Sequence, residues 1–204
     1  MHTPAKPELT RLAELTHAGA VRAAAAFAQL VNEPISAAVP ILHERDVTAA
    51  VELAGPPGDV GSTGVFFEFE GCLDALVGIL FPADGSERLV RCIVGIEAGP
   101  LDPTIVESAL MEVGNILASH VASGIADALK ARLLPSIPAL ANGRAEAEFA
   151  AWVERVVGAE APGVEAALCD GDGRPVGRLV IVPSSAPDPS FASAAASPST
   201  ADPV

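Results

Sequence analysis

The chain has 204 residues, half of them hydrophobic, which is enough apolar material for the core of a folded domain. Its 12 basic and 26 acidic residues give a formal net charge of −14. This negative charge repels the phosphates of nucleic acid, so no nucleic-acid partner is expected. No apolar run is long enough to cross a membrane and no signal peptide is recognisable, so we expect a cytoplasmic protein without membrane insertion.

The first half of the chain is expected to begin with a long helix, because apolar residues recur at spacings of three and four. Prolines, glycines and alternating apolar residues then divide it into shorter elements. The expected order is long helix, strand, short helix, two strands joined by a tight turn, and short helix, over residues 8–31, 35–41, 44–53, 64–69, 73–81 and 86–94.

The second half repeats this order of elements. A long helix, a strand, a helix and two strands are expected over residues 103–133, 135–140, 144–157, 164–169 and 176–182. The repeats, about 8–99 and 100–183, predict an α/β fold of the α+β kind: one pseudo-two-fold domain whose long helices pack on a β-sheet. Residues 1–7 are expected to form an N-terminal extension, and 184–204, rich in Ser, Ala and Pro, a disordered tail.

The second long helix is expected to carry a strip of short polar side chains. Five of them fall within an arc of about 80° at the helical repeat: Ser108, Glu112, Asn115, Ser119 and Ser123. The opposite, apolar side is expected to pack in the core, and comprises Val106, Leu110, Val113, Leu117, Val121, Gly124 and Ala128. Short side chains around one carboxylate and one amide leave room for another molecule, although an ordinary solvated face fits the pattern equally well.

The polar pair in this strip belongs to a spaced pattern that occurs twice. Glu112, Asn115 and Pro138 form E-x2-N-x22-P. The same spacing occurs 98 residues earlier as E-x2-H-x22-P, formed by Glu14, His17 and Pro40. The shared spacing indicates a duplicated unit, in which the first copy has lost the asparagine that the second copy keeps.

The matching strip of the first long helix consists of Thr10, Glu14, His17, Val21 and Ala25. Glu14 and His17 are spaced like half of a di-iron site, but such a site needs a second Glu-x-x-His and further carboxylates, and the chain has no second Glu-x-x-His. No metal site is therefore expected. The cysteines support the same conclusion, since Cys72, Cys92 and Cys169 are widely separated and form no paired motif.

The pattern S-x3-E-x2-N-x22-P, formed by Ser108, Glu112, Asn115 and Pro138, resembles the signature of the CheC-type phosphatases of chemotaxis, a group that also includes CheX and part of FliY. The two long-helix segments and the closing strand RPVGRLVIVP are also similar to those of the family, so the resemblance spans about residues 8–183. Two copies of the helix favour a CheC-like over a CheX-like protein.

The resemblance implies hydrolysis of the aspartyl phosphate on a CheY-like response regulator. Asn115 would orient the attacking water, and Glu112 would engage a lysine of the receiver domain. Ser108 and Ser119 would support the site and let the receiver come close. No cofactor is expected in this chain, because the resemblance implies that the receiver brings its own Mg²⁺.

In the first copy an imidazole cannot present the geometry of an amide, so Thr10 and His17 are interpreted as a degraded site, with Glu14 kept as a docking candidate. A degraded site also fits an alternative function, that of a non-catalytic chemotaxis adaptor binding a CheD-type receptor deamidase. A third alternative is an α/β interaction domain unrelated to signalling, against which the duplicated spacing argues.

Overall fold

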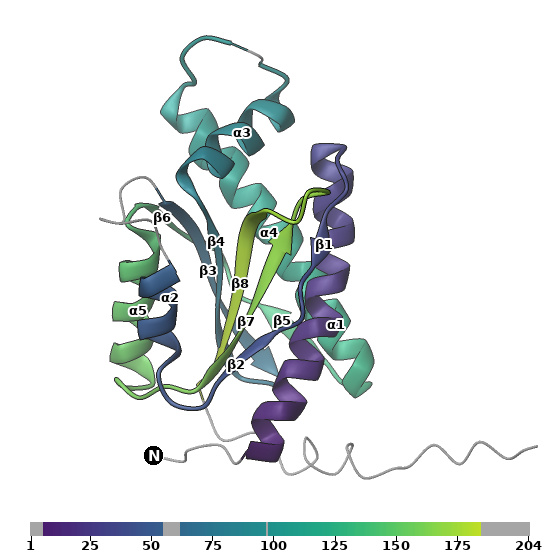
Figure 1. The fold of residues 1–204 in the computed structure, drawn as a ribbon, viewed down its shortest axis with the longest axis vertical. Coiled ribbons are helices and arrows are strands. Elements are labelled where there is room, and N and C mark those ends of the chain that lie inside the picture. The colour runs from purple at the N-terminus through teal and green to yellow at the C-terminus, as the bar shows by residue number, and fades with distance from the viewer. Residues whose placement is uncertain (1–5, 55–61, 97, 185–204) are drawn as a thin grey trace, which may run out of the picture.

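The computed structural model describes residues 6–54, 62–96 and 98–184, and the predicted tail beyond Ser184 lies outside them. One eight-stranded antiparallel sheet has helices on both faces, as predicted for an α+β fold (Figure 1). The helices are α1 (Lys6–Val31), α2 (Val47–Ala54), α3 (Ala83–Val94), α4 (Pro103–Leu129) and α5 (Ala145–Val156). The strands are β1 (Ser36–Ala37), β2 (Ile41–His43), β3 (Ser62–Gly71), β4 (Ala75–Phe81), β5 (Leu133–Pro135), β6 (Ala139–Gly143), β7 (Gly163–Cys169) and β8 (Pro175–Pro183).

The two repeats exchange their first strands. The sheet order is β1-β7-β8-β4-β3-β5, with β2 also pairing with β7 and β6 also pairing with β3. Strands β1 and β2 of the first repeat therefore pair with β7 of the second repeat. Strands β5 and β6 of the second repeat pair with β3 of the first. The hairpins β3–β4 and β7–β8 meet at the centre through β4 and β8, which gives the predicted pseudo-two-fold arrangement.

Two apolar cores lie on the two faces of the sheet. The long helices α1 and α4 cover one face, and α2 and α5 cover the other (Figure 1). Because side chains alternate along a strand, Val65 and Phe67 of β3 enter the first core while Phe66, between them, enters the second. The sheet is thus buried on both sides, and each long helix has one face fixed on it. Among the described residues no helix is both long enough and apolar enough to cross a membrane.

Several predicted boundaries are wrong for identifiable reasons. Helix α1 already begins at Lys6, within the predicted extension, because Pro7 is tolerated in a first helical turn. The predicted strands 35–41 and 135–140 are each two short strands, interrupted near Pro40 and Pro138, since proline cannot donate to a ladder. Helix α4 ends at Leu129 instead of residue 133, because Lys130 is left-handed, with φ 52° and ψ 38°.

The turn between β3 and β4 also lies later than predicted. Strand β3 continues through Glu70 to Gly71, and Asp74 of the turn accepts a hydrogen bond from the Gly71 amide at 3.2 Å. Gly71 has φ +133°, and a Cβ there would lie 2.3 Å from the carbonyl oxygen of Arg132. The glycine thus belongs to the paired strand end, where β5 comes too close for any side chain.

The long helix α4 starts at a favourable cap. Asp102 accepts a hydrogen bond from the Thr104 amide at 2.8 Å, and Pro103 occupies the first turn. Helices α1 and α4 run in opposite directions (Figure 1), and they contact each other at Gly19 and Gly124. A Cβ on Gly124 would lie 2.7 Å from the Cα of Gly19, so only glycines permit this separation of the two helices.

Candidate functional site

The polar strip that the sequence predicts on α4 is exposed. Its five members all lie at the surface: Ser108, Glu112, Asn115, Ser119 and Ser123. The opposite face is buried by Leu110, Val113, Leu117 and Val121 as expected, whereas Ala128, predicted to be buried, is exposed in the last turn of α4, where Leu129 packs against the core instead. One helix thus has a rigid packed side and a free side with short side chains.

Glu112 and Asn115 lie one helical turn apart on this strip. Neither side chain makes a hydrogen bond or an ion pair with any residue that the structure describes. The amide of Asn115 can donate two hydrogen bonds and accept others, and the carboxylate of Glu112 can only accept when charged. The pair can therefore hold a water molecule with the amide and a cation with the carboxylate, and both groups are free to do so.

The matching strip on α1 is also exposed, but its carboxylate is occupied. Thr10, Glu14 and His17 lie at the surface of α1. Arg11 donates from Nη1 to Oε2 of Glu14 at 2.8 Å. The two strips lie on separate helices of the same layer, so the structure holds one Glu–Asn site and one Glu–His site.

The fold brings strand β6, which follows the proline of the spaced pattern, next to the strand on which the second site rests. A Cβ on Gly114 would lie 2.5 Å from Cγ1 of Val65, so the middle of α4 rests on β3 at this point. Val65 pairs with Leu140 of the edge strand β6, and Pro138 lies two residues before Leu140. Segments far apart in the sequence therefore meet at one edge of the sheet, next to the turn that carries Glu112 and Asn115.

Ser136 holds this edge in place. Its amide donates to the carbonyl of Glu68 at 2.8 Å, and its hydroxyl accepts from the Glu68 amide at 2.9 Å. In the interval between β5 and β6 the hydroxyl therefore supplies the acceptor that the Glu68 amide of β3 requires. Sequence reasoning did not assign this role to Ser136, because the strand that it bridges is distant in the chain.

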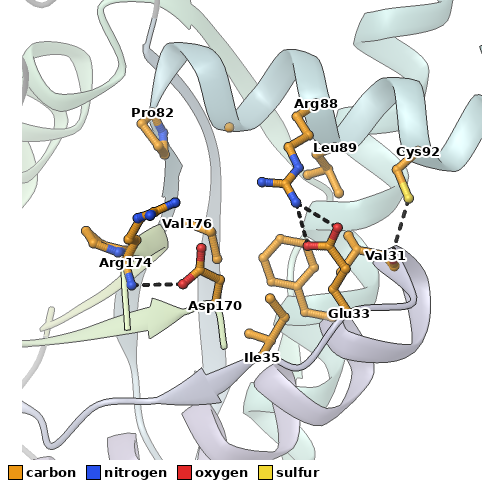
Figure 2. A pocket seen from close by; sticks show the side chains of 13 residues that line it. Val31, Glu33, Ile35, Pro82, Arg88, Leu89, Cys92, Asp170, Arg174 and Val176 are labelled. Carbon is orange, nitrogen blue, oxygen red and sulfur yellow. Dashed lines mark hydrogen bonds and ion pairs between the residues drawn. The ribbon is translucent and has the colours of Figure 1, made fainter. Parts of the chain in front are cut away.

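A separate cleft of about 190 Å³ lies between the end of α1, helix α3 and the β7–β8 turn (Figure 2). Its polar groups bind one another: Arg88 donates to both carboxylate oxygens of Glu33 at 2.7 Å, and Asp170 accepts from the Arg174 amide at 2.9 Å. These contacts raise the pKa of Arg88, mainly through its hydrogen bond to Glu33, and lower that of Asp170, mainly through its backbone hydrogen bond from Arg174.

None of the strip residues on α1 or α4 lines this cleft. A pocket is the default place to look for a ligand site, but the paired charges of this one leave no free group for chemistry. We therefore assign the candidate site to the exposed Glu112 and Asn115. Among the described residues no group of three or more His, Cys, Asp or Glu side chains could hold a metal ion, so Glu14 and His17 gain no further ligands.

Comparison with known proteins agrees with the motif. The model of the CheC-like family matches residues 105–140, which contain Glu112, Asn115 and Pro138 but no part of α1. The CheY-P phosphatase CheC of Bacillus subtilis (strain 168) is 31% identical over 131 residues, or 62% of this chain and 62% of the relative. The chain thus matches less than two thirds of that relative's length.

Solved structures share the fold at low sequence identity. FliY of Thermotoga maritima superimposes with a TM-score of 0.64 at 16% identity, covering 90% of this chain and 93% of that one. A chain of the CheX–CheY–BeF3–Mg²⁺ complex from Borrelia burgdorferi superimposes with a TM-score of 0.51 at 17% identity, covering 81% and 96%. Together with the family match, they confirm the predicted resemblance to the CheC-like family.

Proposed function

We propose that this CheC-like chain hydrolyses the aspartyl phosphate of a CheY-like response regulator, using Glu112 and Asn115 of α4. The observation that carries the proposal is the free, exposed state of both side chains, one turn apart on a strip with short neighbours. The relative named CheY-P phosphatase supports the substrate class. Because response regulators of this kind are cytoplasmic, we place the reaction in the cytoplasm.

The chemistry requires little from this chain. An aspartyl phosphate is an activated acyl phosphate, and catalysis of phosphoryl transfer consists mainly of positioning and charge stabilisation. Mg²⁺, which the receiver would supply, neutralises charge on the phosphoryl oxygens. What is missing is a water molecule in line with the phosphorus, and this is the group that the Asn115 amide would orient.

Glu112 would fix the docking geometry. Its carboxylate has no partner among the described residues of its own chain, so it can form a charge-assisted hydrogen bond with an ammonium group of the receiver. Ser108 and Ser119 flank the pair with side chains too short to hold the receiver away. In this role Glu112 is a binding and orienting group, and Asn115 is the catalytic residue.

The test is phosphate release from a CheY-like receiver phosphorylated with a small-molecule donor. We expect the wild-type chain to accelerate release and Asn115→Ala to slow it by about a hundredfold, since the water is no longer oriented. His17→Ala, at the corresponding exposed position of α1, is the matched control and should leave the rate unchanged. Phosphate release by the wild type at the receiver's own rate would reject the proposal.

A second candidate function is that of a non-catalytic adaptor for a CheD-type receptor deamidase. It is favoured by the first copy, in which His17 replaces the asparagine and Glu14 is paired within the chain. A pull-down of the purified chain with a purified CheD-type protein tests it. Binding that survives Asn115→Ala, together with a wild type that releases no phosphate, would favour this function over hydrolysis.

A further inference from the structure

Gly114 lies between Glu112 and Asn115 in the sequence but on the opposite, buried side of α4. A Cβ added to it would lie 2.5 to 2.7 Å from three atoms of Val65, namely Cγ1, Cβ and Cγ2. Separations this short are not tolerated between carbon atoms, and Val65 is fully buried in the first core. The absence of a side chain at residue 114 therefore allows α4 to approach β3 as closely as it does.

The first copy of the motif differs at this position. The residue 98 positions before Gly114 is Thr16, which is completely buried. Its hydroxyl has no hydrogen-bond partner among the described residues. A threonine brings a Cβ and two further atoms, so the buried face of α1 is bulkier at Thr16 than that of α4 at Gly114. The copy that lost its asparagine is thus also the copy that has no glycine at this position.

We propose that Gly114 is a positioning residue for the reaction assigned above. Because Gly114 lets α4 pack directly on Val65, it fixes the distance of Glu112 and Asn115 from the sheet edge near Pro138. This inference rests on the proposed function. The receiver would contact both the strip on α4 and the adjoining edge, so a helix displaced outward would carry the water-orienting amide away from the phosphorus. A displacement of about 1 Å can lower a rate about a hundredfold.

The decisive comparison is between two glycines of the same helix. Gly114→Ala and Gly124→Ala both introduce a Cβ at a buried position without room, the second 2.7 Å from the Cα of Gly19. Both gain the same helix propensity, so general effects on α4 are matched. Only Gly114 lies beneath the Glu112–Asn115 turn, so only its substitution should move that turn against β3.

We expect Gly114→Ala to lower kcat for phosphate release at least tenfold, and Gly124→Ala to change it less than about twofold, at a temperature where both are folded. The double variant Gly114→Ala/Val65→Ala removes two of the three opposing atoms and should regain part of kcat despite lower thermal stability. A purely structural role would not produce this recovery. Equal kcat losses in the two single variants, or none in Gly114→Ala, would overturn the inference.

Three further results are decisive. If Gly114→Ala alone does not fold, the double variant is compared with Val65→Ala, and equal kcat values overturn the inference. An active wild type that depends on Asn115 but is indifferent to Gly114→Ala rejects only the positioning role. A wild type without activity rejects the proposed function, and the positioning role with it.

Discussion

Arg11 and Glu14 are joined across one turn of α1, with 2.8 Å between Nη1 and Oε2, whereas Glu112, the counterpart of Glu14 in α4, has no such partner in the part of the chain that the structure describes. The residue that corresponds to Arg11 in the second copy is Ala109. An exposed pair of this spacing is worth only about 0.3–0.5 kcal/mol, which is roughly a factor of two in occupancy. The ion pair therefore biases Glu14 away from a partner without closing the first site by itself.

The first site should be recoverable by restoring the residues of the second. In a chain that carries Asn115→Ala, we expect the combination Arg11→Ala, Thr16→Gly and His17→Asn to produce phosphate release above the receiver's own rate. Arg11→Ala alone should produce none, because the amide would still be missing. The measurement is phosphate release from a phosphorylated CheY-like receiver.

The control for this graft adds Glu14→Ala to the three substitutions. It should remove the gained activity, because the docking carboxylate of the first strip is lost. A graft that folds but remains at the receiver's own rate would mean that α1 lacks more than these three residues, and that the duplicated spacing overstates the similarity of the two sites.

The repeats and the exposed strips could be predicted because their signals are local. Helical periodicity places Asn115 on the face opposite Leu117, and the structure confirms both positions. The exchange of short strands between repeats could not be predicted, since it depends on pairing between distant segments such as β6 and β3. The role of Gly114 was missed for the same reason, because only the structure shows that Val65 lies beneath it.

Charged residues within strands were equally hard to interpret from the sequence. Arg178 of β8 is expected to be exposed like most arginines, yet its side chain is only 13% exposed. It donates to Glu146 at 2.7 Å and approaches Glu165 at 3.5 Å, and the Glu146 side chain is 3% exposed. One guanidinium thus serves two carboxylates between the sheet and α5.

Loss of this guanidinium should be strongly destabilising. We expect Arg178→Met to lower the free energy of unfolding by about 3–5 kcal/mol, because Glu146 is left buried without a counter-charge. Arg174→Met is the matched control: its side chain is 77% exposed, so its effect should stay within about 0.5 kcal/mol. Urea denaturation measures both values.

A compensating variant separates the unpaired charge from simple loss of packing. Arg178→Met combined with Glu146→Gln and Glu165→Gln should recover much of the lost stability, since no buried charge then lacks a partner. If the triple variant is no more stable than Arg178→Met, packing around the arginine stem is the main contribution of this residue.

Asp46 should make the stability of α2 depend on pH. It precedes the helix, and its carboxylate accepts a hydrogen bond from the Ala49 amide at 2.9 Å and another from the Thr48 hydroxyl at 2.7 Å. These bonds, chiefly that from the Ala49 amide, lower the pKa of Asp46 in the folded chain. Its contribution is therefore complete above the ordinary aspartate pKa of about 3.9 and is lost as the pH falls below it.

Two substitutions distinguish the cap from its charge. Asp46→Ala should lower the free energy of unfolding by about 1 kcal/mol at neutral pH, the usual cost of an N-cap, and by less near pH 3. Asp46→Asn keeps a capping oxygen that does not titrate, so its stability relative to the wild type should rise as the pH falls from 5 to 3. Urea denaturation between pH 5 and pH 3 measures the free energy of unfolding of both variants and of the wild type. If the differences from the wild type stay constant over that range, the helix does not hold the Asp46 carboxylate in its charged form.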